Sequence, residues 1–154
     1  MRSIDKLKTF HAQEVEPYTG HPLGASEAEV FDLERQLGFS LPADYREFLL
    51  WFGRDYNGVL RGTDTFIDHV LENTEELPNL LAKNGLEEKL PKQFVCPFMH
   101  QGYIATWFEV PTCEDDPKGF YFNESESEKG IVSAPTIMTL FYTDISGMAI
   151  HLKK

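Results

Sequence analysis

The chain has 154 residues and carries 25 acidic against 14 basic side chains, a formal net charge of −11. This length suits one domain with one hydrophobic core, and 42% hydrophobic residues suffice to fill it. The charge excludes nucleic acid and anionic membranes as natural partners, since both carry dense negative charge. No apolar run reaches the ~20 residues that span a bilayer, and the charged N-terminal segment does not suit a signal peptide, so we expect a cytoplasmic protein.

The first third of the sequence predicts helices. A short N-terminal helix is indicated by residues near helical spacing, namely Ile4, Leu7 and Phe10 or His11. A second helix is expected over about 26–37, because Ser26 and Glu29 stand three apart as a capping box and Gly38 suits a left-handed C-terminal cap. Pro42 presets the first turn of a third helix, whose apolar face comprises Tyr45, Phe48, Leu49 and Phe52. We interpret that face as core.

The middle of the chain mixes turn and helix signals. Asn57-Gly58 indicates a turn, and the following "VLRGTDTFI" predicts a first strand or hairpin. Thr74 is the expected N-cap of a further helix that ends at Asn84-Gly85, with Pro78 in or near its first turn. Its apolar stripe comprises Leu77, Leu80 and Leu81.

Beyond residue 91 the pattern favours strands. These are "QFVCPF", "YIATWFEV" and "GFYFN", and the second alternates two faces along 103–110. The segment 133–146 is ambiguous, because β-branched residues favour strand while Ser133 and Pro135 favour a capped helix; we expect a helix. Helices followed by antiparallel strands and a last helix predict one α+β domain over 1–154, with helices packed on an antiparallel, possibly mixed, sheet.

The stretch "ASEAEVFDLERQLGFSLPADYREFLLWF" resembles the signature of the SUKH superfamily of Smi/Knr-like proteins. The matching positions are Ser26, Glu29, Leu33, Leu37, Gly38, Leu41, Pro42, Tyr45, Phe48 and Leu49. The resemblance is strongest over 24–60 and extends to about 145, where "FVCPFMHQGY" and "GFYFN" are similar to strands of family members. These motif residues are mostly those predicted to form the core, so the resemblance describes a scaffold.

The resemblance implies a binding role and a SUKH-like fold. Bacterial members are immunity proteins that bind and neutralise a cognate toxin, often a nuclease, of a contact-dependent or polymorphic system, whereas fungal relatives are regulators of cell-wall signalling. The implied function is therefore an immunity protein, and the alternative is a regulatory or adaptor domain that binds another cellular protein. An enzyme that uses an acidic cleft is a third, weaker hypothesis. The resemblance leaves the partner and the oligomeric state open.

Compact catalytic motifs are absent from the sequence. It contains no G-x-S-x-G, H-E-x-x-H, G-x-x-x-x-G-K-[ST] or G-x-G-x-x-G pattern, and its five histidines are dispersed. Glu114, Asp115 and Asp116 could chelate a cation, but adjacent side chains diverge and a solvated loop is favoured. Cys96 and Cys113 lack C-x-x-C spacing and are expected to be reduced thiols. We therefore predict no catalytic residues, no metal and no cofactor.

Acidic residues are concentrated in two segments. Residues 109–128 carry seven acidic side chains against Lys118 alone, and 68–76 carry four with no basic residue. A basic protein, such as a toxin, is the electrostatic complement. Tyr103 and Trp107 could anchor an interface beside these charges, although packing under a helix is the alternative for both. The predicted partner-binding residues are Glu72, Glu75, Glu76, Tyr103, Trp107, Glu114, Asp115, Asp116, Glu124 and Glu126.

Overall fold

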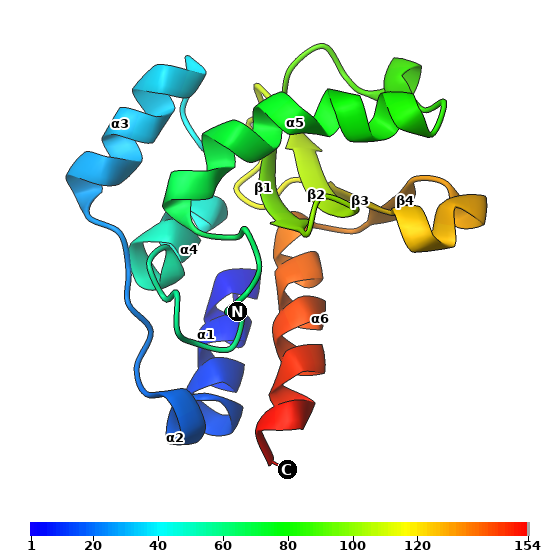
Figure 1. Ribbon diagram of the computed structural model, residues 1–154. Helices are drawn as coiled ribbons and strands as arrows, with labels where there is room; N and C mark the ends of the chain where they lie inside the picture. Colours follow the sequence, from blue (N-terminus) through cyan, green and yellow to red (C-terminus); the bar gives the residue numbers. More distant parts are fainter. Residues whose placement is uncertain (154) are drawn as a thin grey trace.

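A four-stranded antiparallel sheet with the strand order β1-β2-β3-β4 lies at the centre of the fold (Figure 1). The computed structural model describes residues 1–153. The strands are β1 (Phe94–His100), β2 (Ile104–Glu109), β3 (Gly119–Asn123) and β4 (Val132–Ala134). Thr106 of β2 pairs with Phe98 of β1 and with Tyr121 of β3. The three strands predicted from the sequence are confirmed, whereas the short β4 was not predicted.

Helices cover both faces of this sheet (Figure 1). They are α1 (Ser3–Glu14), α2 (Glu16–Thr19), α3 (Glu27–Leu37), α4 (Ala43–Phe52), α5 (Val70–Lys83) and α6 (Ile137–Ala149). Short 3-10 helices lie between or after these elements, namely η1 (Ile67–His69), η2 (Glu87–Lys89), η3 (Glu124–Lys129) and η4 (Ile150–Lys153). The result is the predicted single α+β domain.

The alternation of side chains along the strands divides the core into two layers. Val95 and Phe108 belong to the larger layer, which α1, α3, α4 and α6 complete. Ala105 and Phe122 belong to the smaller layer, which is completed by the leucines of α5. The predicted alternation along 103–110 is therefore confirmed, and it is the reason that both faces of the sheet are covered.

The capped helix predicted at 26–37 is confirmed in its details. The amide of Glu29 donates to Ser26 Oγ at 3.1 Å, and the amide of Ser26 donates to a Glu29 carboxylate oxygen at 3.0 Å. Gly38 follows the last turn with φ +89°, where a side chain would be strained. Pro42 is the N-cap of α4 rather than its first residue, and α4 buries the predicted aromatic face.

The strand or hairpin predicted for 59–67 is wrong. This segment is a series of turns whose only ladder contact is an isolated bridge between Asp64 and Met99. Gly62 has φ +85°, and the hydroxyl of Thr63 donates to the Leu60 carbonyl at 2.7 Å, so local bonds satisfy groups that a strand would pair across a ladder. A β-branched composition could not reveal this local alternative.

The expected start of α5 at Thr74 is also wrong, because the helix begins at Val70. The Thr74 hydroxyl lies inside the helix, where it donates to the Val70 carbonyl at 2.8 Å and accepts from the Cys96 amide at 3.0 Å. It therefore links α5 to β1 instead of capping. Pro78 consequently lies within the helix rather than in its first turn. The predicted end at Asn84-Gly85 is confirmed.

The ambiguous segment 133–146 is mainly a helix, as expected. Thr136 caps α6, since its hydroxyl accepts from the Thr139 amide at 3.2 Å. Ser133 belongs to β4 and does not cap the helix. The centroid of the Phe141 ring in α6 lies 4.3 Å from that of the Phe48 ring in α4. The last helix therefore packs directly against a helix from the first third of the chain.

Candidate functional site

An exposed acidic surface follows α5. Glu72, Glu75 and Glu76 are exposed on one side of the helix, since positions three and four apart lie on the same face. The opposite side buries Leu77 and Leu81 against the sheet. Negative charge near the N-terminal end of a helix is favourable, because the helix dipole is positive there. Of the three carboxylates, only Glu72 lies in the first turn and gains from the dipole, and all three are exposed, so none is desolvated by burial.

A hollow of about 270 Å³ lies beside these residues, between α5 and the turn after β1. Glu72 and Glu76 line it from the helix, and Asp64 lines it from the preceding segment. Asp64 is held in place by its backbone, because its amide donates to the Met99 carbonyl at 2.8 Å and its own carbonyl accepts from Asn73 Nδ2 at 2.7 Å. The sequence reasoning missed Asp64, since only the bridge to β1 brings it to α5.

Basic charge is scarce at this hollow. Lys83 is the one basic residue among those that line it, and its ammonium lies 3.6 Å from the Glu124 carboxylate. Glu72, Glu75 and Glu76 have no ion-pair partner within residues 1–153. We define the acidic α5 surface as Asp64, Glu72, Glu75, Glu76 and Glu124.

Two further predicted residues adjoin the C-terminal end of this surface. The amide of Glu124 donates to the Tyr103 carbonyl at 2.8 Å, and its carboxylate accepts from Asn84 Nδ2 at 2.9 Å. Tyr103 is partly exposed. Glu126, in contrast, pairs with Lys129 at 2.7 Å, so its charge is locally compensated. The structure thus brings Glu124 and Tyr103 to α5, although the sequence separates them from it by at least 20 residues.

The predicted acidic stretch 109–128 does not form one patch. Glu114, Asp115 and Asp116 precede β3, whereas Glu124 follows it, so the strand, which is roughly 13 Å long, lies between them. The carboxylate of Asp116 accepts from the Met138 amide at 3.1 Å, at the start of α6. Asp116 therefore has a structural role, while Glu114 and Asp115 stay exposed.

Trp107 is not a surface anchor, so the first of the two alternatives predicted for it is wrong. Its side chain is 1% exposed and packs in the layer beneath α5. Its ring stacks on Phe120 with the centroids 6.1 Å apart. The alternative, packing under a helix, describes its position, because β2 is an inner strand whose two faces are both covered.

The remaining reactive side chains are dispersed. Cys96 is buried, and burial raises the pKa of its thiol to about 12, whereas Cys113 is exposed and unpaired. Within residues 1–153, no group of three or more His, Cys, Asp or Glu side chains is placed to hold a metal ion. No helix in that range is long and apolar enough to cross a membrane.

A model of the SMI1 / KNR4 family (SUKH-1) matches residues 24–141. The match covers most of the chain, from the loop before α3 into α6, and includes every residue of the acidic α5 surface. No curated protein matches the sequence significantly.

Proposed function

The chain belongs to the SMI1/KNR4 family (SUKH-1), and we propose that it is a non-catalytic cytoplasmic binding protein whose acidic α5 surface contacts a basic protein. The class of partner that fits best is a toxin, which makes this chain its immunity protein. One observation carries the proposal: Asp64, Glu72 and Glu76 line an open hollow whose single basic residue is already paired with Glu124.

Charge complementarity explains why such a surface suits a nuclease toxin. A nuclease must be electropositive to hold phosphates, and an acidic inhibitor is attracted to the same surface. Opposite charges raise association rates from roughly 10⁵–10⁶ toward 10⁸–10⁹ M⁻¹s⁻¹ at low salt. A fast, salt-sensitive encounter is useful to an immunity protein, which must bind before the toxin acts.

The test compares two charge reversals of equal size. Glu72, Glu75 and Glu76 are replaced together by lysine, and a matched variant carries Glu114→Lys, Asp115→Lys and Glu128→Lys. All six side chains are exposed, so both variants should fold. Asp116 is left unchanged, because its carboxylate caps α6.

Stopped-flow association is measured across a salt series with a basic nuclease-domain toxin encoded beside the gene. The α5 variant should associate at least tenfold more slowly at low salt, with a flatter salt dependence, while the matched variant changes little. If instead the matched variant associates more slowly and the α5 variant changes little, the interface includes the loop before β3 rather than α5. Equal, small effects in both variants would contradict an acidic interface altogether. Binding of a neutral cellular protein instead would favour the regulatory alternative.

A further inference from the structure

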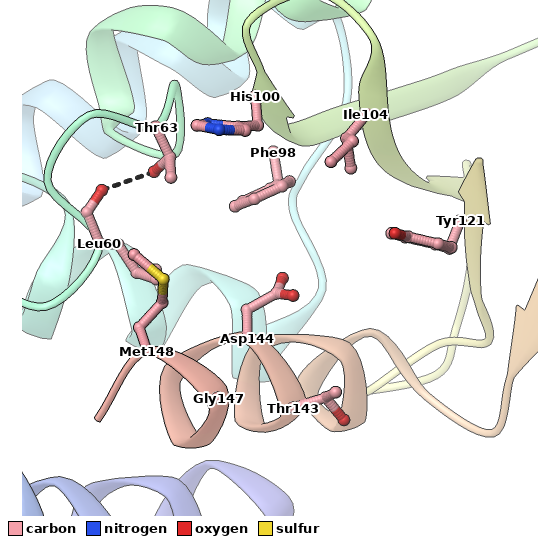
Figure 2. A pocket seen from close by; sticks show the side chains of 10 residues that line it. All are labelled: Leu60, Thr63, Phe98, His100, Ile104, Tyr121, Thr143, Asp144, Gly147 and Met148. Atoms are coloured by element: carbon pink, nitrogen blue, oxygen red, sulfur yellow. Dashed lines mark hydrogen bonds between the residues drawn. The ribbon is translucent and has the colours of Figure 1, made fainter. Parts of the chain in front are cut away.

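A second cavity, of about 240 Å³, lies between α6 and the sheet (Figure 2). α6 contributes Thr143, Asp144, Gly147 and Met148, the strands contribute Phe98, His100, Ile104 and Tyr121, and the turns before η1 contribute Leu60 and Thr63. This volume is below that of a drug-sized pocket and suits a ligand of a few non-hydrogen atoms. The cavity differs from the acidic α5 surface in chemical character, because its walls are mainly apolar.

Asp144 is the only acidic residue among those that line this cavity. Figure 2 shows its carboxylate pointing from α6 toward the strands. Burial raises the pKa of Asp144 to about 7, and within residues 1–153 no cation pairs with it. A carboxyl group placed among Leu60, Phe98 and Ile104 without a cation is unfavourable for the fold, since charge is stabilised poorly in apolar surroundings.

Two other polar side chains of the cavity, His100 and Tyr121, lie at its opposite ends (Figure 2). His100 Nδ1 is buried and has no partner within residues 1–153. The Tyr121 hydroxyl points into the cavity (Figure 2), and the nearby Asp144 charge adds to the burial that raises the pKa of Tyr121. The Thr63 hydroxyl is already used, since it donates to the Leu60 carbonyl. No lysine or arginine lines the cavity.

We propose that this cavity binds a primary ammonium group carried on a short aliphatic stem. An ammonium has three N–H donors and no acceptor, and its positive charge complements the Asp144 carboxylate, the one acidic group that lines the cavity. The stem then lies against Phe98, Ile104 and the other apolar walls. An anion is disfavoured by the Asp144 charge. A free alkylamine and a lysine side chain share this chemistry, and the inference does not rest on the proposed function.

The first test uses n-butylammonium as the probe, with n-butanol and butyrate as matched neutral and anionic controls. Methyl signals of Ile104 and Met148 are followed by NMR in the isotope-labelled protein at pH 8. We expect saturable shifts with n-butylammonium at roughly millimolar concentration, as suits a ligand of about five non-hydrogen atoms. n-Butanol and butyrate should bind at least tenfold more weakly. Equal binding of n-butanol, or no saturable shift with n-butylammonium, would overturn the proposal.

Variants separate the carboxylate from the cavity. Asp144→Asn keeps the shape and should weaken n-butylammonium binding at least tenfold without changing n-butanol binding. Glu88→Gln, at an exposed position of η2 outside both sites, should change neither. Gly147→Leu is a second variant that does not depend on Asp144. A Cβ at Gly147 meets no atom within 4 Å, so the helix should tolerate leucine there and the added side chain should block binding. Unchanged binding in folded Gly147→Leu would place the probe elsewhere.

A second amine probe distinguishes the two sources of the ammonium group. Nα-acetyl-lysine methylamide carries the same group on the same stem but attached to a peptide backbone. If it binds as n-butylammonium does, the cavity accepts a lysine side chain from another chain. If only n-butylammonium binds, the site serves free alkylamines. Both results support the ammonium site and assign its source, and neither depends on an interaction at α5.

Discussion

His11 should make the fold sensitive to mild acid. Its side chain is 0% exposed, at the junction of α1 with α4, where its ring centroid lies 5.2 Å from that of Trp51 and 6.0 Å from that of Phe52. Neither ring nitrogen has a hydrogen-bond partner within residues 1–153. Burial lowers the pKa of His11 from 6.5 to about 4, although the Glu16 charge opposes this shift. The folded protein therefore holds His11 neutral well below neutral pH.

The sign of the effect follows from proton uptake in the two states. Between pH 6.5 and pH 4 the unfolded chain protonates His11 and the folded chain does not, so stability falls as pH falls. For these two pKa values the loss relative to high pH is about 1.4 kcal/mol at pH 5.5 and about 2.6 kcal/mol at pH 4.5. It levels off below pH 4, where both states are protonated.

Urea unfolding of the natural protein and of His11→Leu measures this contribution. Both proteins share all other titrating groups, so the difference between their free energies of unfolding isolates His11. That difference should move in favour of His11→Leu by about 2.6 kcal/mol between pH 8 and pH 4.5. A difference that stays constant over this range would refute the reasoning and show that His11 is protonated, or solvated, in the folded state.

Three other predictions concern buried groups. Phe48→Ala should cost about 3–5 kcal/mol in urea unfolding, because the removed ring leaves a cavity in the core, whereas Phe31→Ala at an exposed position should cost little. Asp144→Asn should unfold at a higher temperature than the natural protein at pH 8, where the charge on Asp144 costs up to about 4 kcal/mol of stability. Near pH 3 the two proteins should unfold at the same temperature, because a raised carboxyl pKa costs stability only as the pH rises through 3.8. Iodoacetamide should modify Cys113 in the native state and reach Cys96 only on unfolding, as mass spectrometry of timed samples would reveal.

The parts of the fold that follow local rules were predictable from the sequence. The capping box of Ser26 and Glu29 fixes where α3 begins, because both bonds lie within four residues. The two-residue alternation along β2 likewise predicted which side chains share a face of the sheet. In α3 the stabilising partners are close neighbours in the sequence. In β2 the alternation of residue types follows directly from the strand geometry.

The parts that depend on distant partners were not predictable. Thr74 has the right chemistry for an N-cap, but the amide of Cys96 in β1 uses its hydroxyl. Asp64 joins the acidic α5 surface only through its bridge to Met99. The candidate cavity at Asp144 gathers residues from three separate parts of the chain, so no spacing in the sequence could have predicted it.

The loop before β3 joins the starts of two helices into one unit. The Asp115 carbonyl accepts from the Asp44 amide in the first turn of α4, while the Pro117 carbonyl and the Asp116 carboxylate accept from the first amides of α6. Two of these three acceptors are main-chain atoms, so most side chains of the loop can vary without loosening it. Opening this loop would expose the first turns of both helices together, and their amides should exchange hydrogen with solvent as one cooperative group.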